Sequence, residues 1–442
     1  MAVLLQSCAS YGQQARTMRD GLLHGDPAAS LAIIEQEDNG QKDVITSLDK
    51  GMLRRINNDY KGSNQVLEVA KNKINALYGF SLTENLASVA INETFRGYEG
   101  DRYEQLLLHA YMAMNYIQLG EMDNARVEML QANVKMKEWG DEPHEDAFLR
   151  YLEAIIYESL AEYDSALISY RKAYIIYKEN SGNQYPVVPL QLKKDLLRLL
   201  DREGLRSEYE SYKKEFAFED YTPFKVSENS GELIVILNNG LAPLRSEAIV
   251  PIYSSEVQQN IRVAFPVYNQ PKQRLFTPRI EVDNKQYSME TVEDVDAQAR
   301  YSLQQAMPGI MARAISRVAV KYNTQKQAHD NGLIASLIMT VTNLVTERAD
   351  TRSWSTLPQE IQLQRIWLPA GSHHVQLQLL SAAGSVVDVI DETVEIKPQR
   401  SSFIIKHWNT PVRKKITKLE AVTALDPQQT HVPTLDKKTV TN

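Results

Sequence analysis

The sequence predicts a multidomain protein, α then α+β, in which an N-terminal array of helical repeats precedes a mainly antiparallel β module with inserted helices. Over residues 15–221, apolar residues recur three and four positions apart, as they do on one face of a helix. From Gly231 the apolar residues instead fall in short runs bounded by turns, as in strands. The charge changes at the same place. Residues 1–220 carry 25 basic and 35 acidic residues, a net charge of −10, whereas the remainder carries +3. A domain boundary is therefore predicted near Tyr221-Thr222-Pro223.

Composition excludes several classes of protein. The chain has 442 residues, is 43% hydrophobic and has a net charge of −7, so it can form ordinary apolar cores. An acidic chain without a basic stripe is unsuited to nucleic acid, because neutralising phosphates requires clustered lysine and arginine. Its single cysteine excludes an intrachain disulfide framework and any zinc site built on several cysteines.

An internal repeat supports the helical array. Residues 102–135 and 147–180 place small and large apolar side chains at matching positions. The first copy has Ala113, Tyr116, Ala125, Met129 and Ala132, and the second has Ala154, Tyr157, Ala166, Tyr170 and Ala173. This pattern is typical of tetratricopeptide (TPR) repeats, helical hairpins in which small residues let two helices approach closely. A weaker copy has Gly51, Ser63, Leu67 and Ala70.

The tyrosines of this half allow two interpretations. Tyr170, Tyr174 and Tyr177 recur at helical spacing. They could be aromatic anchors for a peptide on the concave face of the array. Alternatively they fill the grooves between hairpins, and we favour this second interpretation for most of them.

The second module is predicted to combine strands with two helices. Strands are expected at residues 232–237, 261–268, 279–282 with a hairpin to Tyr287, 361–367, 375–380, 386–396 and 402–406. Helices are expected at 295–322 and 329–348, and Pro308 should kink or split the first. The apolar run at 332–345 is too short to span a bilayer, so we expect a buried core helix, with a membrane-facing surface as the alternative.

The one cysteine lies in a recognisable context. Leu5, Ser7, Cys8 and Ala9 resemble a bacterial lipobox, in which the cysteine thiol carries the lipid and becomes the first residue of the mature chain. Ala9, being other than aspartate, implies sorting to the outer membrane. The apolar run that leads into the box, Met1 to Leu5, has only five residues, fewer than the ~7–15 apolar residues of a signal sequence, so the pattern would need residues upstream of Met1. The competing interpretation is an incidental cysteine near the N-terminus.

A second motif follows the apolar run. Residues 347–358, which include Asp350, Arg352, Trp354 and Pro358, together with Ile361, Arg365 and residues 368–371, resemble the signature of an uncharacterised family of bacterial lipoproteins with N-terminal TPR-like repeats. Residues 59–64 and 98–104 resemble further patches of that family. The resemblance implies an outer-membrane lipoprotein facing the periplasm but transfers no catalytic residues. From the residues themselves, Arg352 could pair with a carboxylate while Trp354 packs on the sheet. We interpret this motif as structural or as a docking element.

No reaction is indicated by the sequence. His-Glu-x-x-His, Gly-x-Ser-x-Gly, P-loop and dinucleotide motifs are absent. We therefore expect no enzymatic activity, no catalytic residues, no cofactor and no metal site. An enzyme acting on peptidoglycan or glycan is the least favoured class.

These observations give a division of the chain and two functional hypotheses. We expect a lipobox and tether at 1–14, a TPR-like domain at 15–221, an α+β domain at 222–409 and a mobile polar tail at 410–442. The first hypothesis is a lipid-anchored periplasmic scaffold or adaptor, attached at Cys8, whose array binds protein partners of the cell envelope. The alternative is an accessory factor in envelope assembly or secretion, with a possible link to peptidoglycan synthesis, whose 332–345 helix engages a membrane or export complex. The partner and the oligomeric state stay open.

Overall fold

The computed structural model describes residues 7–36, 43–83, 97–140, 145–218, 227–254, 259–330 and 348–409, and the statements below concern these residues. The first half forms helices that pair into hairpins, each packed on the next. The helices are α1 (Ser7–Leu23), α2 (Pro27–Gln36), α3 (Val44–Ile56), α4 (Tyr60–Thr83), α5 (Arg102–Gln118), α6 (Met122–Glu138), α7 (Ala147–Ser159), α8 (Tyr163–Asn180), α9 (Leu190–Arg202) and α10 (Arg206–Glu215). The predicted helical array is thus confirmed, and it contains more hairpins than the repeats apparent in the sequence.

Local signals explain where these helices begin. The side chains of Asp43 and Asp146 each accept a hydrogen bond from the backbone N–H three residues later, at 2.9 and 2.7 Å. Asp101 and Glu104 form a capping box at the start of α5. Each cap provides a partner for an N–H group that the first turn would leave unpaired.

Small residues mark the places where the helices approach most closely. Gly51 of α3 faces Leu67 of α4, and Ser63 donates a 2.7 Å hydrogen bond to the Gly51 carbonyl. The repeat alanines are fully buried: Ala113, Ala125, Ala132, Ala154, Ala166 and Ala173. Met129, Tyr157 and Tyr170 are buried beside them, and Tyr116 is partly buried against the same core.

The second half contains three sheets. The strands are β1 (Ser230–Asn239), β2 (Ser246–Ser254), β3 (Gln259–Val267), β4 (Thr277–Val282), β5 (Lys285–Ser288), β6 (Glu290–Asp294), β7 (Glu360–Pro369), β8 (Gly371–Leu380), β9 (Val386–Ile396) and β10 (Ser401–Trp408). The central sheet has the order β10-β1-β7-β6, the second β5-β4-β8-β9, and β2 pairs with β3 alone. All pairs are antiparallel except β1 with β10. The predicted strands are present, whereas β2 and β6 were missed, because a proline interrupts β2 and acidic residues dominate β6.

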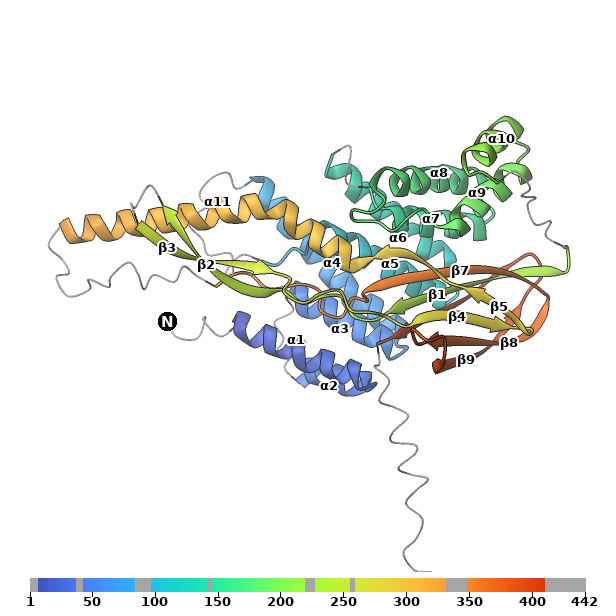
Figure 1. Cartoon of the computed structure of the whole chain (residues 1–442), viewed down its shortest axis with the longest axis horizontal. Coiled ribbons are helices and arrows are strands. Elements are labelled where there is room, and N and C mark those ends of the chain that lie inside the picture. The colour runs from blue at the N-terminus through green and yellow to red at the C-terminus, as the bar shows by residue number, and fades with distance from the viewer. Residues whose placement is uncertain are drawn as a thin grey trace, which may run out of the picture.

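The central sheet is covered on both faces (Figure 1). Along β1, Ile234 and Ile236 belong to the apolar core shared with the helices, while Leu233, Val235 and Leu237 belong to the core shared with the second sheet. This follows from the alternation of side chains along a strand. The molecule is therefore layered as helices, central sheet and second sheet. The array and the β module share one continuous core.

Two parts depart from the expected arrangement. The stretch 7–14, expected to be a tether, is helical, and its Tyr11 is buried. Helix α11 (Val295–Asp330) continues through Pro308, so of the two predicted outcomes, a kink or a split, the split does not occur. The expected helix over 332–345, the predicted boundary at 221–223 and the tail beyond 409 lie outside the described residues.

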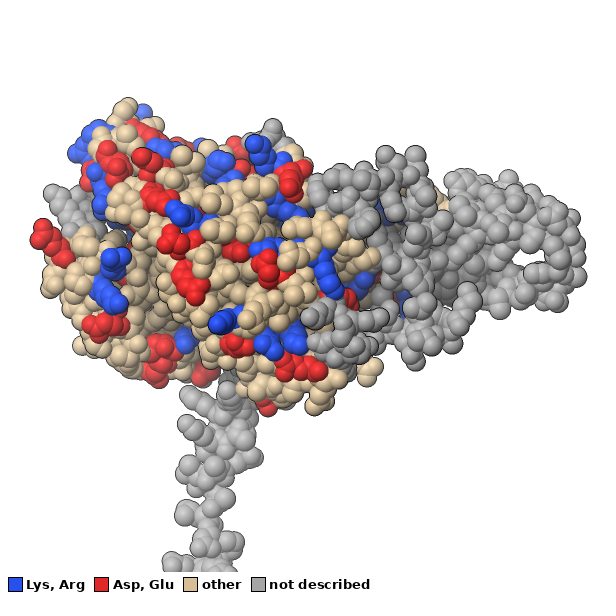
Figure 2. Space-filling view, turned by 180° about the vertical axis from the view of Figure 1, so that it is seen from behind, with Lys and Arg blue, Asp and Glu red and all other residues tan. Residues whose placement is uncertain are grey.

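Helix α11 and the β2–β3 ribbon project from the body along the longest axis of the molecule (Figure 1). We call these three elements the arm. Within the described residues, no helix has the length and apolar character needed to cross a membrane. Figure 2 shows acidic and basic side chains interspersed over one face of the body, without a broad patch of one sign.

Candidate functional site

The first helix of each hairpin lies against the β module. We call α1, α3, α5, α7 and α9 the inner helices, and α2, α4, α6, α8 and α10 the outer helices. Every inner helix makes a polar contact with the second half of the chain: Tyr11 with Ser353, Asp49 with Thr356, Glu104 with Trp354, Glu158 with Arg365, and Asp195 with Arg365. The inner face of the array is therefore covered by the chain's own β module.

A buried ionic cluster lies at the centre of this contact. Arg365 of β7 donates to Glu232 of β1 at 2.6 Å and to Glu158 of α7 at 3.0 Å, and it lies 3.0 Å from Asp195 of α9. Arg198 pairs with Glu158 at 2.6 Å. Burial alone would raise the pKa of Glu158, but the two arginines lower it to about 2. The cluster thus holds ionised groups in an apolar interior, where removing one partner leaves an uncompensated charge.

The family-like motif at 347–358 joins the array to the central sheet. Its Trp354 is buried and packs edge-on against Tyr111 of α5, with ring centroids 5.8 Å apart. The backbone N–H of Trp354 donates to Glu104 at 2.7 Å. Arg352 donates to both oxygens of Asp350, at 2.9 and 2.6 Å. Pro358 is buried just before β7 begins.

Two carboxyl groups hold this motif in place. Asp49 accepts from the Tyr11 hydroxyl at 2.9 Å and from the Thr356 N–H at 3.1 Å. Burial raises the pKa of Asp49 to about 6, against the lowering effect of these hydrogen bonds. Burial and the neighbouring Asp101 raise the pKa of Glu104 to about 7. Because the carboxyl groups of Asp49 and Glu104 are fully buried, their role is to connect the array helices to the 347–358 motif.

The patch at 59–64 reaches the same region from α4. Ser63 and Asn64 both accept hydrogen bonds from the Asn115 side chain, at 2.9 and 2.8 Å. Asn115 in turn accepts from the buried Arg55, whose guanidinium lies 5.6 Å from the centre of the Tyr111 ring. The three sequence patches therefore converge on the contact between array and β module.

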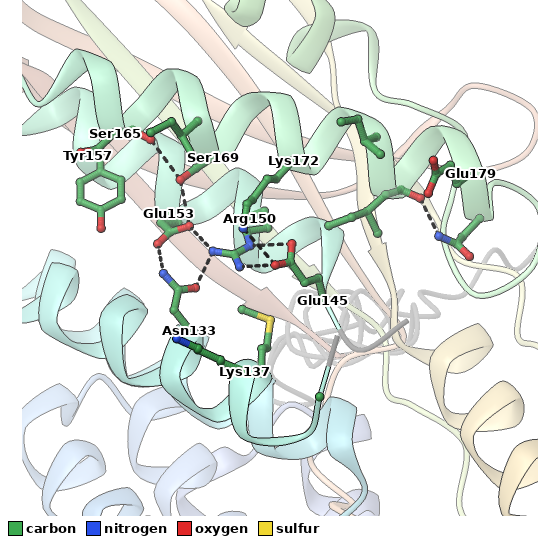
Figure 3. A pocket seen from close by; sticks show the side chains of 16 residues that line it. Asn133, Lys137, Glu145, Arg150, Glu153, Tyr157, Ser165, Ser169, Lys172 and Glu179 are labelled. Carbon is green, nitrogen blue, oxygen red and sulfur yellow. Dashed lines mark hydrogen bonds and ion pairs between the residues drawn. The ribbon is translucent and has the colours of Figure 1, made fainter. Parts of the chain in front are cut away.

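An open groove lies on the other side of the array. It runs between the outer helices α6 and α8, with α7 as its floor, and has a volume of about 1030 Å³ (Figure 3). It is lined by Asn133, Met136, Lys137, Gly140, Glu145, Arg150, Glu153, Tyr157, Ser165, Ile168, Ser169, Lys172, Ile175, Ile176, Glu179 and Asn180. We call it the outer groove.

Arg150 organises the polar floor of the outer groove. It donates to both oxygens of Glu145 at 3.2 and 2.7 Å, to Glu153 at 3.0 Å and to Asn133 at 2.6 Å (Figure 3). The Ser169 hydroxyl donates a 2.9 Å hydrogen bond to the same Glu153 oxygen that accepts from Arg150. Burial favours neutral Glu145, but Arg150 and Lys172 hold its pKa below the ordinary value. The floor is thus a fixed, internally paired polar network.

Apolar side chains border this floor. Ile168 and Ile175, one heptad apart on α8, are 55% and 45% exposed. On α6, Val127, Leu130 and Val134 are also exposed. A set of large exposed apolar residues beside a groove is a common property of protein-binding surfaces.

The other candidates from the sequence lie elsewhere. Tyr170 and Tyr177 are buried at the β module, where Tyr170 accepts from Arg365 at 2.6 Å and Tyr177 donates to the Val292 carbonyl at 2.5 Å. Cys8 lies in α1, but its side chain is outside the described set. Over the described ranges, no group of three or more His, Cys, Asp or Glu is placed to hold a metal ion.

Sequence reasoning missed the outer groove. Arg150 and Glu153 stand one helical turn apart on α7, which is a weak signal that an ion pair shares the face of one helix. Nothing in the sequence indicates that Asn133 of α6 and Ser169 of α8 complete this network.

Comparisons with known proteins give limited information. No protein-family model matches the chain, and no curated protein matches it. Similar solved structures include MamA from AMB-1, with 13% identity and a TM-score of 0.31 over 47% of this chain and 90% of that one. Others are MamA of Desulfovibrio magneticus RS-1 (12%, 0.30, 46% and 92%) and a Podospora anserina putative kinesin light chain with TPR-like repeats (13%, 0.32, 47% and 92%). At these TM-scores the similarity gives no basis for assigning partners or activity.

Proposed function

We propose that this chain is a non-enzymatic scaffold lipoprotein of the bacterial envelope, attached to the outer membrane at Cys8 and facing the periplasm, which binds a segment of a partner protein in the outer groove. The outer groove carries this proposal. It is a large hollow in the array surface, and the exposed Ile168 and Ile175 of α8 line one side of it.

The position of the β module supports the choice of surface. Arrays of helical repeats commonly bind partners on an extended concave surface. Here the inner helices are already engaged by β strands and by the 350–358 segment. A partner is therefore expected at the outer helices, since the inner contacts around Arg365 are buried.

The lining of the groove suggests the form of the partner segment. Ile168 and Ile175 are seven residues apart, which matches the apolar repeat along one face of an amphipathic helix. Lys137 and Glu179 lie at the sides and can pair with either sign of charge on such a helix. We propose a short amphipathic helix of a second envelope protein as the ligand.

The attachment at Cys8 rests on the lipobox-like sequence and fits the position of α1. Tyr11, three residues after Cys8, donates to Asp49 at 2.9 Å and to the Ser353 carbonyl at 2.7 Å. A lipid on Cys8 would thus hold the folded body close to the membrane, without a long tether. Metabolic labelling with a radioactive fatty acid tests this attachment, and label retained by Cys8→Ala would contradict it.

Partner binding can be tested with point variants of the full chain. Deleting the array is unsuitable, because the array and the β module share one core. We expect crosslinking in cells to capture a partner with the wild type but not with Ile168→Asp/Ile175→Asp. Val386→Asp, at an exposed position of β9, is the matched control and should capture normally. Undiminished capture by the groove variant, or equal loss in the control, would refute the proposal.

A further inference from the structure

The arm carries an apolar surface that the scaffold role does not use. Strand β2 pairs only with β3 in the described chain. Residues directly opposite each other share a face of the ribbon, and Val250 lies opposite Val263. Val263 is buried in a small cluster with Ala314 of α11. The face that contains Val250 and Val263 is therefore the one turned toward α11, which buries Val263 of β3 and leaves Val250 of β2 43% exposed.

The opposite face of the ribbon points away from α11. Because side chains alternate along a strand, Ile249, Pro251 and Tyr253 share this second face. Tyr253 is 64% exposed and Ile249 is 40% exposed, and Pro251 is exposed between them. Ile249, Pro251 and Tyr253 are thus three neighbouring apolar or amphipathic side chains on one face of a projecting element, and Arg262, directly opposite Pro251, is exposed on the same face.

The chemistry of β2 argues against addition of a further strand. An open strand edge attracts another strand through its unpaired N–H and C=O groups. Pro251 has no N–H, and proline is tolerated in a strand where that position faces the open edge. Pro251 therefore removes one of the backbone N–H donors that an added strand would need. The occupant is expected to contact the side-chain face.

The direction of the arm identifies the occupant. Along the longest axis, α1 begins at the end of the body from which the arm projects (Figure 1). The proposed lipid attachment at Cys8 therefore lies toward the same end as the exposed face. Tyrosine is favoured at the boundary between headgroups and acyl chains, where its ring is apolar and its hydroxyl is hydrated, and isoleucine gains from burial in the acyl region.

We propose that the face formed by Ile249, Pro251 and Tyr253 rests on a phospholipid bilayer surface. This inference goes beyond the scaffold role and uses from it only the position of Cys8. The arm would thus make a second, weaker contact with the membrane and fix the orientation of the outer groove above it.

The test uses the full chain without its lipid, as the Cys8→Ala protein. Its partition onto vesicles of phosphatidylethanolamine and phosphatidylglycerol is measured by flotation. We expect measurable binding that falls about tenfold or more in Ile249→Asp and Tyr253→Asp. Each substitution removes the favourable free energy of transferring one apolar side chain from water into the bilayer. Val386→Asp, at an exposed apolar position of β9 outside both the arm and the outer groove, is the matched control and should bind as its parent does. Thermal melts confirm that each variant is folded.

Two results would overturn the inference. One is the absence of vesicle binding by the Cys8→Ala protein, or an equal loss of binding in Val386→Asp. The other is a result in which the Cys8→Ala protein does not bind vesicles but is a dimer that Ile249→Asp converts to a monomer. That result would assign this face to a second copy of the chain. Both readouts are independent of partner capture at the outer groove, so failure here is distinguishable from failure of the scaffold proposal.

Discussion

Arg365 and Glu158 lie 207 positions apart in the sequence, and the Arg365 guanidinium donates a 3.0 Å hydrogen bond to the Glu158 carboxylate in the buried contact between array and β module. The same arginine contacts Glu232 and Asp195. It therefore serves as a shared cation for three carboxylates from three different elements. The assembly of the two halves depends on this residue.

Replacing this cation should destabilise the whole molecule. In Arg365→Met, three buried carboxylates keep only Arg198 as a cation, so we expect a loss of about 3–5 kcal/mol in the free energy of unfolding. Arg126→Met, which breaks a more exposed pair with Glu162, should cost less than about 1 kcal/mol. Urea denaturation followed by circular dichroism measures both. Similar losses in the two variants would show that the buried cluster is energetically unimportant.

A buried carboxyl group should give the protein a measurable pH dependence. Burial and the nearby Asp146 raise the pKa of Glu293 well above its ordinary value, against the lowering effect of the Gln298 side chain. A carboxyl with a higher pKa in the folded than in the unfolded chain stabilises the fold at low pH. That contribution is lost as the pH rises from about 4, its unfolded pKa, toward the folded pKa.

Glu293→Gln should therefore reduce this loss. We expect its free energy of unfolding to fall less than that of the wild type from about pH 5 to about pH 9. Glu210→Gln, at an exposed site on α10, serves as the control and should follow the wild-type curve. Parallel curves for wild type and Glu293→Gln would mean that Glu293 does not carry the expected shift.

Two helical glycines should respond in opposite directions to alanine. A Cβ on Gly51 would lie 2.5 Å from Leu67, so Gly51→Ala must displace that side chain and should cost about 1–3 kcal/mol. A Cβ on Gly12 of α1 would meet nothing closer than 3.9 Å, so Gly12→Ala should gain about 0.5–1 kcal/mol from helix propensity. Thermal melts compare the pair. A stabilised Gly51→Ala protein would show that α3 and α4 can separate freely.

The attachment of α1 to the body can be measured through one hydroxyl. In Tyr11→Phe, Asp49 and the Ser353 carbonyl lose a donor in a buried site, and we expect a cost of about 1–3 kcal/mol. Tyr253→Phe removes a hydroxyl from an exposed side chain and should leave stability unchanged. If Tyr11→Phe also left the free energy of unfolding unchanged, the start of α1 would behave as the tether that the sequence suggested for residues 1–14.

Much of the local structure followed from the sequence, because it depends on neighbouring residues. Apolar spacing located the helices and most strands, and the alanines of residues 102–135 and 147–180 indicated paired helices. The exceptions have local causes. Pro251 concealed β2, and Pro308 left open a split of α11 that does not occur.

The contacts that define the candidate sites were decided only by the tertiary structure. The pairing of Arg365 with Glu158 and Asp195, and of Arg150 with Asn133, joins residues that no periodicity connects. The sequence by itself determined two modules with different charge and periodicity and a cysteine in a lipobox-like setting. Only the folded chain decided that the β module covers the inner helices and leaves the outer groove open, because burial of apolar faces from both halves in one core fixes which surface is left for a partner.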